Sequence, residues 1–197
     1  IPASLSTLKE KAFEDCENLQ AVMFEDSEYS INFSTLSSNF DGCKKLATLH
    51  INREILYDQL NEDNNSPFSS ASSTLTHVVI GPRVTMVGGG LLLGWDALSS
   101  VTFEYSPKPL SFLRTPGADL HTAKGKGLTP LQINRTLVDN DGYDLIGPQW
   151  GEKISSHVAE ITFGDEITSL RDRAFEGFTG LKVLILPPTM QSVGERA

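Results

Sequence analysis

The stretch FGDEITSLRDRAFEGFTGLKVLIL spans residues 163–186 and contains one complete copy of a unit that recurs along the chain. Its apolar positions are Phe163, Ile167, Leu170, Ala174, Phe175, Phe178, Leu181, Leu184 and Leu186. These spacings match neither the 3.6-residue period of a helix nor the two-residue period of a strand throughout. The pattern starts again at Leu186, so the period is 23 residues and indicates a repeat protein.

A short run of the form L-x-x-φ-x-φ, where φ is apolar, marks each copy and predicts a short strand, because its last three positions alternate. These runs are anchored on Leu19/Val22/Phe24, Leu46/Leu49/Ile51, Leu75/Val78/Ile80, Leu98/Val101/Phe103, Leu128/Leu131/Ile133, Val158/Ile161/Phe163 and Leu181/Leu184/Leu186. Further along each coil, φ-x-x-φ pairs such as Ile167/Leu170 predict a second extended segment. The i, i+3 spacing in residues 12–19 and 174–181 predicts a single helical turn.

The coils follow a longer period of three. Their lengths run 23, 27, 29 and then 23, 30, 30 residues between successive anchors. Side chains agree: residues 24–33 parallel residues 103–112, LHINREI (49–55) parallels LQINRTL (131–137), and Phe68 corresponds to Trp150. We therefore expect blocks of three coils, each about 80 residues long, that bury their apolar faces only when stacked.

Charge and composition limit the functional classes. The net charge is −9, with no Lys/Arg cluster, and no apolar run is long enough to cross a membrane. Nucleic acid and insertion into a membrane are therefore not expected. The sequence starts inside one repeat and stops inside another. We accordingly expect a single domain over residues 1–197, about seven coils, truncated at both ends.

The stretched coils contain polar segments rich in Gly, Pro, Ser, Asn and Asp. These are residues 57–74, 113–127 and 138–157. Their composition predicts loops along one rim, without residues that build the core.

The unit resembles the BspA-like class of bacterial leucine-rich repeats. The residues that carry the resemblance are 1–24, 80–103, 163–186 and 186–197, while the four longer coils keep mainly the strand anchors. The resemblance implies a cell-surface or secreted protein of a host-associated bacterium, in a family linked to adhesion and to binding of host or matrix proteins. The predicted fold is an elongated right-handed leucine-rich repeat solenoid, mostly short strands with short helical turns and long irregular loops.

Two cysteines stand at one repeat position. Cys16 and Cys43 occupy the place that Trp95 and Phe178 fill in other coils. We expect two unpaired core thiols, and the alternative is a disulfide between neighbouring coils.

Other suggestive residues lack the pattern that their chemistry needs. His50 and His77 fall on neighbouring predicted strands but have no third ligand at metal spacing. Residues 88–94 and 124–128 are rich in Gly but do not match a phosphate-binding loop. No catalytic motif is present either, so we expect neither an enzyme nor a cofactor.

Asp139, Asp141 and Asp144 form the most suggestive acidic group. When Gly142 is placed at the sixth position of a calcium loop, Leu137 and Pro148 fall where the end ligands are needed. A solvated acidic loop is therefore favoured over a calcium site.

The strand residues between the anchors should form one exposed sheet face, the surface that solenoids use for binding. By register these are Ala21, Met23, Glu25, Thr48, His50, Asn52, His77, Val79, Ser100, Thr102, Glu104, Pro130, Gln132, Asn134, Glu160, Thr162, Val183 and Ile185. The candidate binding residues among them are Met23, Thr48, His50, Asn52, His77, Thr102, Glu104, Gln132, Asn134, Glu160 and Thr162.

The leading hypothesis is a monomeric surface module that binds a protein or glycan partner through this face. In this hypothesis the partner comes from the host. A structural spacer that presents other domains is the alternative. A carbohydrate-active enzyme is a third hypothesis and would need carboxylates clustered in a cleft.

Overall fold

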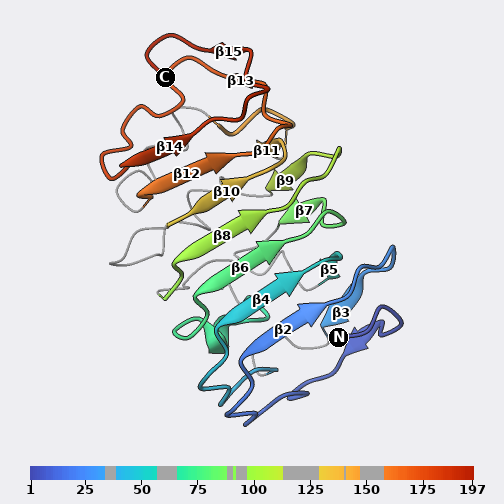
Figure 1. Ribbon diagram of the computed structural model, residues 1–197. Coiled ribbons are helices and arrows are strands. Elements are labelled where there is room, and N and C mark those ends of the chain that lie inside the picture. The colour runs from blue at the N-terminus through green and yellow to red at the C-terminus, as the bar shows by residue number, and fades with distance from the viewer. Residues whose placement is uncertain are drawn as a thin grey trace.

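The computed structural model describes residues 1–33, 39–56, 66–87, 91, 97–112, 129–139, 141–146 and 158–197. Its main feature is one sheet of seven parallel strands in the order β14-β12-β10-β8-β6-β4-β2 (Figure 1). The strands are β2 (Ala21–Phe24), β4 (Thr48–Ile51), β6 (His77–Ile80), β8 (Ser100–Phe103), β10 (Leu131–Ile133), β12 (Glu160–Phe163) and β14 (Val183–Ile185). Each predicted anchor run supplies one of these strands, which confirms the predicted leucine-rich repeat solenoid.

Shorter strands form the opposite wall. They are β1 (Thr7–Leu8), β3 (Ile31–Phe33), β5 (Ile55–Leu56), β7 (Met86–Val87), β9 (Leu110–Phe112), β11 (Leu137–Asp139), β13 (Ser169–Leu170) and β15 (Ser192–Val193). They pair as three separate sheets, β1-β3-β5, β7-β9-β11 and β13-β15. The breaks between these sheets fall at the ends of the three-coil blocks predicted from the sequence.

The turns that join the two walls have the same three-coil period. Between a long-sheet strand and the next short strand lie residues 25–30, 52–54 and 81–85 in the first round, then 104–109, 134–136 and 164–168 in the second. Each round therefore has a long, a short and an intermediate turn. Glu54 helps to end the first block, because its Oε1 accepts hydrogen bonds from the Thr85 backbone N–H and hydroxyl.

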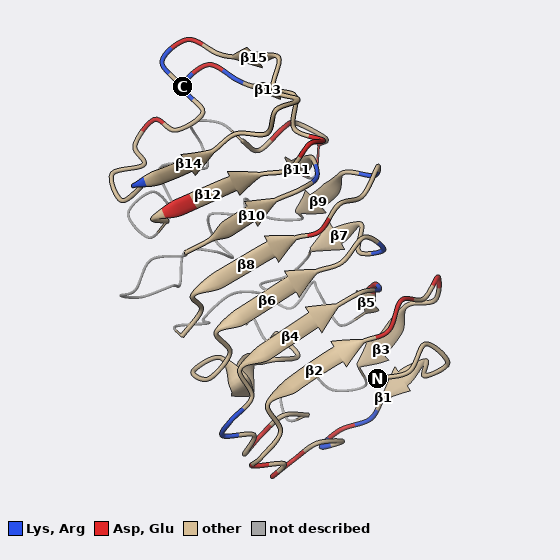
Figure 2. Ribbon diagram, in the orientation of Figure 1, with Lys and Arg blue, Asp and Glu red and all other residues tan. Residues whose placement is uncertain are grey.

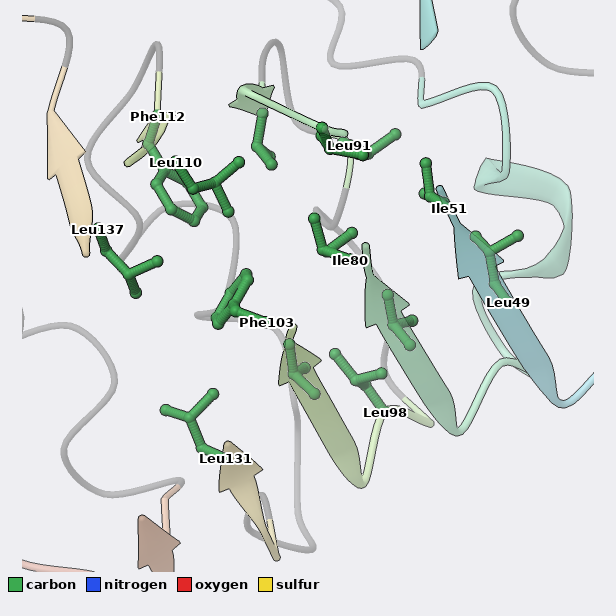
Figure 3. Packing of buried hydrophobic residues seen from close by; sticks show 14 of the residues in the cluster. Leu49, Ile51, Ile80, Leu91, Leu98, Phe103, Leu110, Phe112, Leu131 and Leu137 are labelled. Carbon is green, nitrogen blue, oxygen red and sulfur yellow. The ribbon is translucent and has the colours of Figure 1, made fainter. Parts of the chain in front are cut away.

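The core lies between the walls and follows from the alternation in the strands. In β2 Val22 and Phe24 point inward while Ala21 and Met23 are exposed. Figure 3 shows side chains from the long sheet, such as Ile80 and Phe103, directed toward the same interior as residues of the other wall, such as Leu110, Phe112 and Leu137.

Two of the segments predicted to lack core residues contribute to the core. Phe68 is fully buried and contacts Phe24, Phe33 and Phe40 edge to face or stacked. The prediction for residues 57–74 was therefore wrong where the structure describes them, because a stretched coil must still fill its own layer of the solenoid. Residues 138–157 likewise bury Leu145 and Ile146.

Several predictions fall on residues outside the described part. These are the loop 113–127, the aromatic positions Trp95 and Trp150, and the glycine-rich stretches 88–94 and 124–128, of which only Leu91 is described.

The segments predicted as helical turns contain consecutive hydrogen-bonded turns. The N–H of Cys16 donates to the Phe13 carbonyl and that of Leu19 to the Cys16 carbonyl, at 3.2 and 2.9 Å. Phe178 and Leu181 repeat this arrangement in the later coil. Within the described residues the one helix is η1 (Ser69–Ala71), and no helix is long and apolar enough to cross a membrane.

The two cysteines differ in burial. Both thiols are free, but Cys43 is buried and Cys16 is exposed. The core assignment of Cys16 was therefore wrong: it lies in a turn whose neighbouring residues Asp15 and Glu17 are exposed as well. Burial, followed by the neighbouring Cys16, raises the pKa of Cys43, whose Sγ donates to the Phe13 carbonyl at 3.2 Å.

Candidate binding face

The outward side chains of the long sheet form rows that run across the seven strands. The central row is set by the strand register and consists of Met23, His50, Val79, Thr102, Gln132, Thr162 and Ile185. A second row consists of Ala21, Thr48, His77, Ser100, Glu160 and Val183, with Pro130 just before β10. With strands about 4.8 Å apart, the rows extend for about 29 Å.

None of these side chains is buried, as the alternation predicted. Met23, at one end of the central row, is 57% exposed, whereas the middle of the row is half-buried by its neighbours on adjacent strands. Val183 and Ile185 are exposed at the other end, where β14 pairs with β12 alone. The face therefore has a mainly polar middle, interrupted by Val79, between two apolar ends.

Side chains on the face contact one another across strands. The Thr102 hydroxyl donates to Gln132 Oε1 at 3.1 Å. His50 Nε2 lies 3.4 Å from Glu104 Oε2, across the intervening strand β6. His77 lies on the neighbouring strand, as predicted, but its Nδ1 contacts the hydroxyl of Thr76 at 2.7 Å. The two histidines share the face without forming one site.

Charged residues are sparse on the strands of this face. Figure 2 shows the long-sheet strands mostly uncharged, with Glu160 at the start of β12 and Lys182 beside β14, and the other charges gathered at the turns. A face of hydroxyls, amides and imidazoles can form many hydrogen bonds with a partner without desolvating charges.

Asn52 and Asn134 lie against glycines of the next coil, Gly81 and Gly164. If Gly81 carried a Cβ, that atom would lie 1.9 Å from Asn52 Oδ1, which is too close for a non-bonded contact. A Cβ on Gly164 would lie 2.4 Å from Asn134 Oδ1. Glycine at these positions thus lets the asparagine amide of one coil fit against the backbone of the next.

A hollow of about 400 Å³ adjoins the face at Asn134. It is lined by Tyr105, Asn134, Gly164, Asp165 and Glu166. These residues come from the turns after β8, β10 and β12, so three consecutive coils form the hollow. The turn 134–136, which contributes Asn134, is shorter than the turns on either side of it.

Two buried arginines, which sequence reasoning did not single out, hold the short turns in place. Arg53 and Arg135 are 0% exposed. Burial lowers the pKa of both, that of Arg135 to about 10, so Arg135 stays protonated at neutral pH. The repeated Asn-Arg pair at 52–53 and 134–135 was the signal that could have revealed them.

The acidic group at 139–144 stabilises a local turn. Asp139 Oδ1 accepts the backbone N–H groups of Asp141 and Tyr143 at 2.9 and 2.8 Å, and Asp144 Oδ1 accepts that of Ile146. Across the described residues no group of three His, Cys, Asp or Glu side chains is arranged to hold a metal ion.

Comparison with known proteins gives one match. The model of the BspA type leucine rich repeat region matches residues 1–111 and 153–197 in six copies. Neither a curated protein nor a solved structure matches the chain.

Proposed function

Because this chain belongs to the BspA-type leucine-rich repeat family, we propose that it is a surface-exposed or secreted binding module that recognises a protein or glycan partner through the exposed face of the long sheet. The observation that supports the proposal is the central row, in which Thr102, Gln132 and Thr162 follow one another on adjacent strands and His50 lies beyond Val79. Families of this kind often serve in adhesion and protein interaction.

Size and preorganisation support this role. A face about 29 Å wide and several residues deep offers the roughly 800 Å² per partner that a specific interface buries. Its side chains stand on strands fixed by hydrogen bonds on both sides, so little conformational entropy is lost when a partner binds. The alternative, a spacer without a ligand, would not require polar side chains that hydrogen-bond to one another across the strands of this face.

The test is a screen of the chain against purified extracellular-matrix proteins and a glycan array, followed by a face variant. The variant changes Thr48, His50, Thr102 and Gln132 to Ala. A matched control changes four exposed polar residues of the opposite wall, Thr7, Asn32, Ser169 and Ser192, to Ala.

We expect saturable binding that the face variant weakens by about tenfold or more while the control retains it. If the chain binds nothing on either array, or if the two variants bind alike, the spacer role replaces this proposal.

A further inference from the structure

The hollow beside Asn134 has a counterpart in the first round of turns, and the side chains there show what it can hold. There the long turn 25–30 and the intermediate turn 81–85 face each other across the short turn 52–54. Arg83 closes the gap: its Nε donates to Asp26 Oδ1 at 2.9 Å, and its Nη1 lies 3.9 Å from Glu28 Oε1. A guanidinium therefore spans this place in the first round of turns.

The second round of turns has the same lengths with different side chains. Glu166 stands three residues after β12, as Arg83 does after β6, and Tyr105 stands two residues after β8, as Asp26 does after β2. Glu166 thus stands where Arg83 stands in the first round, and Tyr105 stands where Asp26 does. The gap is open and forms the hollow of about 400 Å³.

The side chains lining the hollow suit a guanidinium brought by another molecule. Asp165 and Glu166 supply carboxylates, and among the ion pairs of the described residues none involves either of them. Tyr105 is 56% exposed and offers a ring face against which a planar cation can stack. No lysine or arginine lines the hollow.

We propose that the hollow formed by Tyr105, Asn134, Asp165 and Glu166 binds an arginine side chain of a partner protein segment that lies across the long-sheet face. The inference rests on the proposed binding role and specifies the partner as a basic protein segment. Arginine is favoured over lysine because its planar fork can contact a carboxylate through two N–H groups while it stacks on an aromatic ring. The chain's net charge of −9 favours the approach of such a segment.

The experiment titrates the whole chain with N-acetyl-arginine amide and follows backbone amide shifts by NMR. We expect saturable shifts at Tyr105, Asn134 and Gly164–Glu166, and none with N-acetyl-citrulline amide, which has nearly the same shape without the charge. A variant with Asp165→Asn and Glu166→Gln should bind about tenfold more weakly or not at all. Glu176→Gln, at an exposed carboxylate that does not line the hollow, should leave binding unchanged.

The first round of turns provides a matching test site. Arg83→Ala should leave Asp26 and Glu28 without this ion-pair partner. Titration with N-acetyl-arginine amide should then also shift the backbone amide signals around Asp26 and Glu28. Lysine amide should bind either place more weakly.

Equal shifts with the citrulline probe, or unchanged binding in the Asp165/Glu166 variant, would overturn the inference. So would stronger shifts with methyl glycosides than with the arginine probe, because these would assign the hollow to a sugar. None of the residues changed in the four-alanine face variant lines the hollow. A negative titration together with a face variant that loses its partner would therefore reject the arginine site alone.

Discussion

Arg53 and Arg135 occupy equivalent places in the two blocks, and each crosses a neighbouring coil to reach main-chain carbonyls. Arg53 donates to the carbonyls of Pro2, Ala3 and Leu5 at 2.9 to 3.0 Å. Arg135 donates to those of Gly81, Lys108 and Pro109 at 2.8 to 3.4 Å. Each short turn is flanked by longer turns, and the guanidinium of its arginine, which has five N–H donors, hydrogen-bonds to backbone carbonyls of preceding coils.

Replacing Arg135 by Met should destabilise the chain by about 3 kcal/mol, because the buried Gly81 carbonyl and the partly buried carbonyls of Lys108 and Pro109 lose their donor. Arg135→Lys should lose less, since an ammonium can still donate to some of them. Urea unfolding followed by circular dichroism measures both. An unchanged midpoint for the Met variant would show that the carbonyls do not depend on this arginine.

Gly81→Ala should destabilise the chain by about 1 to 3 kcal/mol, because the new Cβ would collide with Asn52 Oδ1. Adding Asn52→Ala removes that oxygen and should restore part of the loss. The unfolding midpoints of the two single variants and the double variant form a thermodynamic cycle. Strictly additive effects would contradict the contact between this pair.

Ellman's reagent should modify one thiol quickly in the native chain and two in urea, because Cys16 is exposed and Cys43 is buried. Two fast thiols in the native chain would contradict the burial of Cys43. Fewer than two thiols in urea without reductant would instead indicate the disulfide considered from the sequence.

The raised pKa of Cys43 also predicts a dependence of stability on pH. The neutral thiol is favoured in the fold, so its contribution is complete below the unfolded thiol pKa of about 8.5 and is lost as the pH rises through the folded value. Between pH 8 and 10 the free energy of unfolding of the wild type should therefore fall more than that of Cys43→Ala. Parallel curves for the two proteins would contradict the shift.

Asp139→Ala should loosen the turn after β11 and cost about 1 kcal/mol, because its carboxylate accepts two backbone N–H groups. Asp139→Asn keeps an acceptor oxygen and should be milder. Calorimetry should show no binding of calcium at millimolar concentration. Calcium binding that disappears in Asp139→Ala would restore the metal hypothesis.

The strands and the three-coil period could be predicted from the sequence because both depend on apolar residues that recur at fixed spacing. The outward position of His50, Thr102 and Gln132 followed from the same alternation. The hollow could not be predicted, because it depends on how turns of unequal length in three coils lie beside one another. Arg53 and Arg135 were missed for a related reason: a polar residue after a strand normally indicates a solvated turn, and only the neighbouring coils enclose it.

The most direct test of the binding face is a single bulky charge at its centre. Thr102 lies on β8, the middle strand of the seven, and Asn32 lies on the opposite wall. Surface plasmon resonance with a protein or glycan partner from the arrays should show that Thr102→Arg weakens binding by about tenfold or more, while Asn32→Arg leaves it unchanged. Equal affinities for the two variants would contradict binding through the long-sheet face.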